Sequence, residues 1–158
     1  MRVLAAIDGS SCSHDVIDAI SQRAWESGTI IKLVTVIEQS DEPYRSKGGY
    51  HRIDQKPDIV APSQPYSYLS EFVVKLRSGF REPYNDVLVD PEVVFAEHVS
   101  DMILKLSRDW NADLIVVGTH GRSGLERIVM GSVSTSIVQR SSIPVLIART
   151  NSDHAQRA

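Results

Sequence analysis

The sequence lacks the features that stabilise small secreted proteins or mark membrane proteins. Cys12 is the only cysteine in 158 residues, so no disulfide can form within the chain. No apolar run approaches the roughly 20 residues that a membrane-spanning helix requires, so we expect no membrane span. The opening apolar segment is also too short to predict a secretory signal. Together these absences favour a cytoplasmic protein that folds around its own core.

An excess of basic residues is also missing. Lys and Arg number 17 against 20 Asp and Glu, which gives a net charge of −3. The cations are scattered along the chain rather than grouped with aromatic residues, so we do not expect a nucleic acid partner. The five histidines show no spacing typical of a structural zinc site.

Strand patterns alternate with helix patterns along most of the chain. Apolar and β-branched runs predict strands over residues 2–7, 29–37, 92–95, 114–117 and 143–148, with Asp90-Pro91 interrupting the third region. Helical spacing predicts one helix capped by Ser11 or Ser13 and ending at Gly28, a second over 67–79 and a third from about Val99, and a fourth helix starts near Ser132. This order predicts an open, five-stranded parallel sheet with helices on both faces.

We expect a single domain over residues 1–149. Residues 38–66 contain four of the seven prolines and predict a long mobile loop, and residues 150–158 predict a flexible tail. Pro144 near the start of the last strand favours an edge position, which predicts a homodimer formed through Ile143 to Ala148.

The most informative segment is glycine-rich and joins a strand to a helix. Four of the nine glycines lie within residues 118–131, after the apolar run that ends at Val117 and before the helix that starts near Ser132. Glycines allow close approach of the backbone, and a helix N-terminus offers unpaired N–H groups, so this order predicts a phosphate-binding site. The simpler alternative is an ordinary tight turn. Neither the lysine-containing phosphate loop nor the compact GxGxxG motif is present.

The segment resembles the ATP-binding branch of the universal stress protein family, whose signature is G-x2-G-x9-G-[ST]. Gly118, Gly121, Gly131 and Ser132 match this spacing without a gap. The resemblance extends from the opening strand with Asp8-Gly9-Ser10 to Ile143-Pro144-Val145-Leu146. It implies a Rossmann-like fold of the adenine nucleotide alpha hydrolase type, with ATP and Mg as cofactors.

The resemblance also implies roles for individual residues. Asp8 would lie near the ribose, the phosphates or a bound Mg²⁺, and Ala6 would border the adenine. Val36 would offer backbone groups to the adenine edge. The ribose and phosphates would be contacted by the glycine segment and the helix that follows, which supply Val117, Gly118, Gly121, Gly131, Ser132 and Val133.

Several of these residues have simpler alternatives. Asp8 could form a local turn, and Ser132 could cap the following helix. Arg122 and Arg127 could add positive charge to the nucleotide site or be solvated loop residues.

Three functions are compatible with the pattern. The first is a nucleotide-dependent regulator or sensor in the stress response, with at most slow ATP hydrolysis and no assigned catalytic residue. The second is an ATPase or phosphotransferase that uses the same crevice, although phosphoryl transfer needs a positioned nucleophile and charge clamp that the sequence does not display. The third is a nucleotide-free dimeric interaction module.

Overall fold

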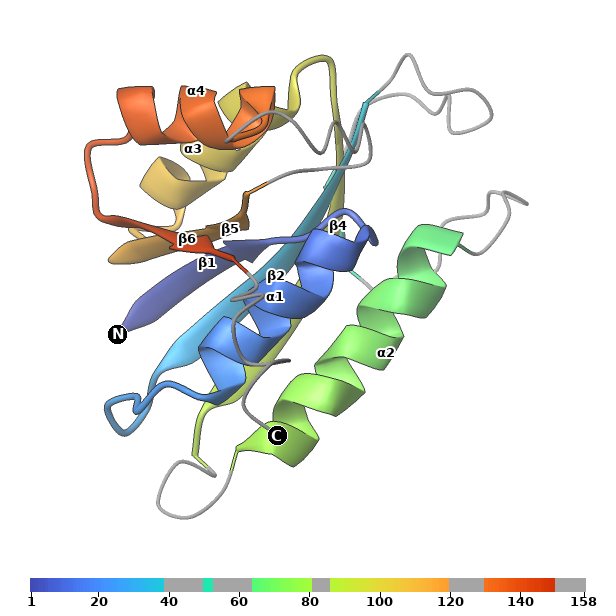
Figure 1. Ribbon diagram of the computed structural model, residues 1–158, viewed down its shortest axis with the longest axis vertical. Helices are drawn as coiled ribbons and strands as arrows, with labels where there is room; N and C mark the ends of the chain where they lie inside the picture. The colour runs from blue at the N-terminus through green and yellow to red at the C-terminus, as the bar shows by residue number, and fades with distance from the viewer. Residues whose placement is uncertain (39–49, 53–63, 81–85, 120–129, 150–158) are drawn as a thin grey trace, which may run out of the picture.

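The computed structural model describes residues 1–38, 50–52, 64–80, 86–119 and 130–149 of the chain. The strands are β1 (Arg2–Ala6), β2 (Ile30–Glu38), β3 (Tyr50–Arg52), β4 (Leu88–Ala96), β5 (Leu114–Gly118) and β6 (Val145–Ala148). The helices are α1 (Ser11–Ser21), α2 (Gln64–Gly79), α3 (Val99–Asp109) and α4 (Ser132–Arg140). Helices α1 and α2 cover one face of the sheet, and α3 and α4 cover the other (Figure 1).

The sheet has the strand order β3-β4-β2-β1-β5-β6. Five strands are parallel, which confirms the predicted five-stranded parallel sheet, and β6 lies at an edge. From β1 the chain adds β2 and β4 on one side and then β5 and β6 on the other. The order therefore reverses between β1 and β5, and ligands of such sheets bind beyond the carboxyl ends of the strands at this reversal.

The region predicted as a loop contains a strand that the sequence pattern did not reveal. Strand β3 pairs antiparallel with β4 over three residues and forms the other edge of the sheet. Glu38 belongs to β2, and α2 begins at Gln64 rather than near Ser67. The rest of the predicted loop, and the predicted tail from residue 150, lie outside the described residues.

The prediction that Asp90-Pro91 interrupts the third region was wrong, because β4 runs through it from Leu88 to Ala96. The Leu88 N–H donates to the Thr29 carbonyl at 3.0 Å, so even-numbered residues of β4 turn their backbone toward β2. Pro91 therefore turns its nitrogen to the other side, and the β3 pairing begins only at Glu92. The strand tolerates proline here because, among the described residues, no strand pairing requires its missing N–H.

The predicted boundaries of the first helix were also wrong. Helix α1 ends at Ser21, and its N-cap residue is Ser10 rather than Ser11 or Ser13. The buried Trp25 donates its Nε1–H to the Ile20 carbonyl at 2.9 Å, which satisfies one of the last helical carbonyls. Gly28, the predicted stop, lies in the following turn with φ of +72°.

Two apolar clusters occupy the two faces of the sheet. The first packs Leu33 and Val93 against Ile17 and Ile20 of α1 and Leu76 of α2. The second gathers residues of β1, β2 and β5 under α3 and α4, namely Leu4, Val34, Ile115, Ile103, Leu106 and Ile137. The buried positions of the predicted helices thus confirm their helical periodicity.

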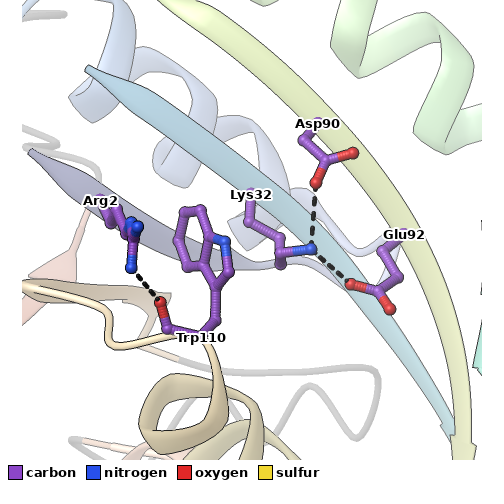
Figure 2. A network of polar contacts seen from close by, with 5 residues as sticks. All are labelled: Arg2, Lys32, Asp90, Glu92 and Trp110. Carbon is purple, nitrogen blue, oxygen red and sulfur yellow. Dashed lines mark hydrogen bonds and ion pairs between the residues drawn. The ribbon is translucent and has the colours of Figure 1, made fainter. Parts of the chain in front are cut away.

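A cluster of charged residues interrupts the face on the α3 side (Figure 2). The Lys32 ammonium on β2 contacts the Glu92 carboxylate at 2.8 Å and the Asp90 carboxylate at 3.0 Å, both on β4. It also lies 5.3 Å from the centre of the Trp110 ring, whose carbonyl accepts a hydrogen bond from Arg2 at 3.1 Å. Burial lowers the pKa of Lys32, but the hydrogen bonds to Glu92 and Asp90 and their charges outweigh it, so the pKa lies above its ordinary 10.5.

Candidate functional site

A cavity of about 350 Å³ lies beyond the carboxyl ends of β1, β2 and β5. Its wall combines these strand ends with the first turns of α1 and α4 and with one side of α3. The lining residues are Ala6, Ile7, Asp8, Cys12, Ser13, Val16, Val36, Glu38, Val99, Ile103, Val117, Gly118, Gly131, Ser132, Val133 and Ser134. The cavity therefore occupies the position at which the strand order reverses.

The structure brings most of the predicted site residues together in this one wall. They are Ala6, Asp8, Val36, Val117, Gly118, Gly131, Ser132 and Val133. Gly121, Arg122 and Arg127 lie outside the described residues. Sequence reasoning missed several lining residues, among them Glu38, Val99 and Ile103. Glu38 could have been found from its spacing, because residues i and i+2 of a strand share a face and Val36 was already assigned.

Asp8 organises the turn between β1 and α1. Its Oδ1 accepts hydrogen bonds from the Ser10 N–H and the Ser13 hydroxyl, each at 3.0 Å. The Ser13 oxygen in turn accepts the N–H groups of Asp8 and Gly9 at 3.1 and 3.0 Å. Gly9 has φ of +79°, a backbone conformation that side chains disfavour. The turn-forming alternative for Asp8 is thus present in the structure, while Asp8 also lines the cavity.

Hydrogen bonds hold the start of α4 against the end of β5. The Ser134 hydroxyl donates to the Gly118 carbonyl at 2.7 Å, and the Gly131 N–H donates to the Thr119 carbonyl at 2.7 Å. Gly131 is the N-cap residue of α4, and no side chain caps this end, so Ser132 does not serve as the cap. The first N–H groups of a helix have no partner within it, and those of α4 belong to residues that line the cavity. The helix end therefore presents donors and the positive end of its dipole to the cavity.

Gly118 packs closely against α1. A Cβ built on it would meet the Cys12 Cβ at 3.0 Å and the Cys12 carbonyl oxygen at 3.2 Å. This contact joins the end of β5 to the first turn of α1. A side chain here would require Cys12 to move by a few tenths of an ångström, so close packing and not a positive φ favours glycine at this position.

Strand β2 extends past the end of β1 along the cavity. The last paired residues are Ala6 and Val34, and the Ile7 N–H donates to the Val34 carbonyl at 2.9 Å. Even-numbered residues of β2 therefore turn their backbone toward β1. By the same alternation, the N–H and C=O of Val36 point toward the β1 side of β2. Strand β1 has already ended at this point, so these groups lie beyond its last paired residue. These groups are a donor and an acceptor for the edge of a planar ligand.

The charged groups in the described part of the wall are two carboxylates, those of Asp8 and Glu38. Within the described ranges, no cluster of three or more His, Cys, Asp or Glu side chains could hold a metal ion. A cation at Asp8 would therefore need further ligands from phosphate oxygens or water, as Mg²⁺ commonly does. None of the helices in the described ranges is long and apolar enough to cross a membrane.

Comparison with solved structures places the fold among known proteins. A universal stress protein in complex with cAMP matches with a TM-score of 0.62 and 24% identity, over 96% of this chain and 98% of that one. A universal stress protein from Archaeoglobus fulgidus in complex with dAMP matches with a TM-score of 0.63 and 17% identity, over 94% and 98%. These likenesses establish the fold.

Sequence comparison identifies the family. A universal stress protein from Mycobacterium tuberculosis H37Rv is 38% identical over 149 residues, and universal stress protein A homolog 1 of Coxiella burnetii is 32% identical over 149 residues. The matches cover 93% and 92% of this chain, but 45% of the mycobacterial protein and 93% of the Coxiella protein. The chain thus spans about half the length of the mycobacterial relative. The model of the universal stress protein family matches residues 1–149, and the chain belongs to this family.

Proposed function

We propose that this protein binds ATP in the cavity and acts as a nucleotide-dependent regulator or sensor in the stress response. The observation that carries the proposal is that one cavity joins the start of α4, the Asp8 turn and the free backbone edge of Val36. The cAMP and dAMP bound to the two structural neighbours are adenine nucleotides, which supports the same ligand class here. The single free cysteine fits a reducing compartment, and we propose a cytoplasmic location.

The wall suggests one orientation for the nucleotide. The phosphates would accept hydrogen bonds from the N–H groups at the start of α4, including those of Ser132 and Val133. The ribose would lie between Gly118 and Asp8, and the adenine would place its N1 and 6-amino groups against the Val36 N–H and C=O. Gly121 and Arg122 would complete the phosphate site from the glycine segment. Ala6 and Val117 would border the base.

We also propose that Asp8 holds Mg²⁺ together with the phosphates. Its carboxylate lines the same cavity as the start of α4, and hard cations prefer oxygen ligands. When bound, the cation would neutralise the negative charge of the phosphates, because the described lining contains no positively charged side chain. We expect hydrolysis to be slow at most, because phosphoryl transfer needs a positioned nucleophile and charge clamp and no residue is assigned to either role.

Nucleotide release and calorimetry test the proposal. Freshly purified protein is denatured, and any released nucleotide is identified by chromatography and mass, while stripped protein is titrated with MgATP. The test variant is Ser132→Glu, which adds a negative charge at the exposed first position of α4. A glutamate there stabilises a helix but repels phosphate, so MgATP affinity should fall about tenfold or more without a loss of thermal stability.

Gln139→Glu is the matched control, because it adds the same charge to an exposed position in the last turn of α4, away from the cavity. It should bind MgATP as the original protein does. An original protein that carries no nucleotide and gives no heat with MgATP would refute the proposal and favour an interaction module. Rapid phosphate release that Asp8→Ala abolishes would favour the enzyme instead.

We further propose that two copies pair through β6. The N–H groups of Ile115 in β5 and of Thr119, which follows β5, donate to the carbonyls of Pro144 and Ala148. Even-numbered residues at this edge therefore face β5, and Val145 and Ile147 face outward. Ile147→Pro would remove an outward N–H without disturbing the pairing with β5, whereas Ile147→Val would keep it. Analytical ultracentrifugation should show a dimer for the original protein and Ile147→Val, and a monomer for Ile147→Pro. A monomeric original protein would refute this pairing.

A further inference from the structure

Glu38 is a cavity residue to which neither the glycine signature nor the phosphate site gives a role. It is the last residue of β2, and its carboxylate and that of Asp8 are the acidic groups of the described cavity wall. We infer that Glu38 is a specificity-determining residue that selects purines with a 6-amino group over purines with a 6-oxo group. This inference rests on the proposed binding of ATP in the same cavity.

The position of Glu38 places it beside the base rather than the phosphates. Val36 and Glu38 are two residues apart on β2, so their side chains share a face and lie about 7 Å apart along the strand. The start of α4 borders β5, whereas β2 lies on the other side of β1. A nucleotide whose phosphates lie at α4 and whose ribose lies by Asp8 therefore brings its base to β2. Val99 and Ile103 of α3 add apolar surface to the cavity wall.

The direction of β2 decides which part of the base faces Glu38. Along a strand, the N–H of a residue precedes its C=O, so the Val36 carbonyl is nearer to Glu38 than the Val36 N–H. An adenine that accepts from this N–H through N1 donates one 6-amino hydrogen to the carbonyl. Its second 6-amino hydrogen then points farther along the strand, toward Glu38. A carboxylate is an acceptor only, and it suits this remaining hydrogen.

A 6-oxo purine in the same orientation would meet repulsion at each of these groups. Its O6 would face the Val36 carbonyl and the Glu38 carboxylate, and its N1–H would face the Val36 N–H. Glutamine has nearly the same size as glutamate, but its amide can also donate to O6. The substitution Glu38→Gln should therefore remove the part of the discrimination that Glu38 contributes, while the Val36 backbone and the shape of the cavity stay unchanged.

The test compares MgATP with MgITP, which have the same phosphates and ribose and differ at position 6 of the base and at N1. Calorimetric titration of the stripped protein should show an ATP preference of about tenfold or more. Glu38→Gln should narrow this ratio several-fold, mainly by a gain in ITP affinity, and the preference that remains would come from the Val36 backbone. Glu38→Ala should narrow it through a loss of ATP affinity. Glu97→Gln is the matched control, because Glu97 is an exposed carboxylate beyond the end of β4 that does not line the cavity.

The outcomes separate this inference from the function on which it rests. A Glu38→Gln variant that binds both nucleotides with the original ratio would overturn the role of Glu38 and leave ATP binding intact. An equal change in the ratio of ATP to ITP affinity in Glu97→Gln would overturn it as well, because the effect would then come from the loss of a negative charge anywhere on the protein. If the original protein binds neither nucleotide, the proposed function fails and the inference fails with it.

Discussion

The Lys32 ammonium lies 2.8 Å from the Glu92 carboxylate, and both side chains are less than a tenth exposed. The two residues occupy the neighbouring strands β2 and β4 and face the α3 side of the sheet, with Asp90 as a second partner at 3.0 Å. None of the three lines the cavity. These three residues therefore contribute to the pairing of β4 with β2 and not to the cavity.

Replacing Lys32 with methionine should destabilise the protein strongly. The substitution keeps a long apolar stem but leaves the Glu92 carboxylate buried without its cation, which costs about 3 to 5 kcal/mol in comparable cases. Urea unfolding measures this loss. Lys75→Met is the matched control, because the Lys75–Asp18 pair is nearly half exposed and should contribute less than about 1 kcal/mol. Equal effects of the two substitutions would contradict the prediction.

The same cluster predicts a loss of stability at alkaline pH. The pKa of Lys32 in the folded protein lies above 10.5, because its hydrogen bonds and the charges of Glu92 and Asp90 outweigh burial. A raised folded-state pKa stabilises the fold fully below the unfolded value of 10.5, and this contribution disappears as pH rises through the folded-state pKa. Unfolding free energies measured across this range should fall less steeply for Lys32→Met. Parallel curves for the two proteins would argue against the pKa assignment.

At acid pH, Asp86 should contribute to the loss of stability. Its carboxylate accepts hydrogen bonds from the Ser27 hydroxyl and from the Gly28 N–H, which lower its pKa below 3.8. A lowered folded-state pKa stabilises the fold above 3.8, and this contribution is lost as pH falls through the folded-state pKa. Asp86→Asn should therefore show a smaller decrease in melting temperature on acidification. An unchanged acid profile would show that these hydrogen bonds do not persist in solution.

Ser134→Ala should weaken both the fold and nucleotide binding. The buried Ser134 hydroxyl donates to the Gly118 carbonyl at 2.7 Å, and its loss should cost about 1 kcal/mol of stability. Because this bond holds the start of α4 against β5, MgATP affinity should also fall several-fold. Ser136→Ala is the control, since Ser136 bonds to Ser100 at 3.2 Å and does not line the cavity. A Ser134→Ala variant with unchanged MgATP affinity would show that this hydrogen bond does not contribute to nucleotide binding.

Much of the fold was predictable because its signals are local. The five parallel strands appear as apolar runs, and the buried positions of α1 and α2 appear as helical spacing, since burial on one face imposes a period on the chain. The glycine spacing indicated the family, and the resemblance supplied half of the sixteen residues that line the described cavity, Asp8 and Val36 among them. The roles of these residues toward ATP and Mg²⁺ stay predictions.

Other features depend on partners far away in sequence. Pro91 is tolerated in β4 because its nitrogen turns away from β2 and lies beyond the described pairing of β3. Trp25 donates to the Ile20 carbonyl in the last turn of α1. Neither the continuation of β4 through Pro91 nor the end of α1 at Ser21 could be predicted from local propensity. The strand β3 forms only because β4 offers an unpaired edge, and three residues are too few for a periodic pattern.

The sequence by itself determined the alternation of elements, the family and the residue types that reach the carboxyl ends of the strands. Only the tertiary structure decided that β1 lies between β2 and β5, which brings Glu38, Asp8 and the start of α4 to one cavity. It also decided that Lys32 meets Glu92, 60 residues later in the chain. The physical reason is that periodicity specifies which side of an element is buried, whereas strand order and register specify which buried groups meet.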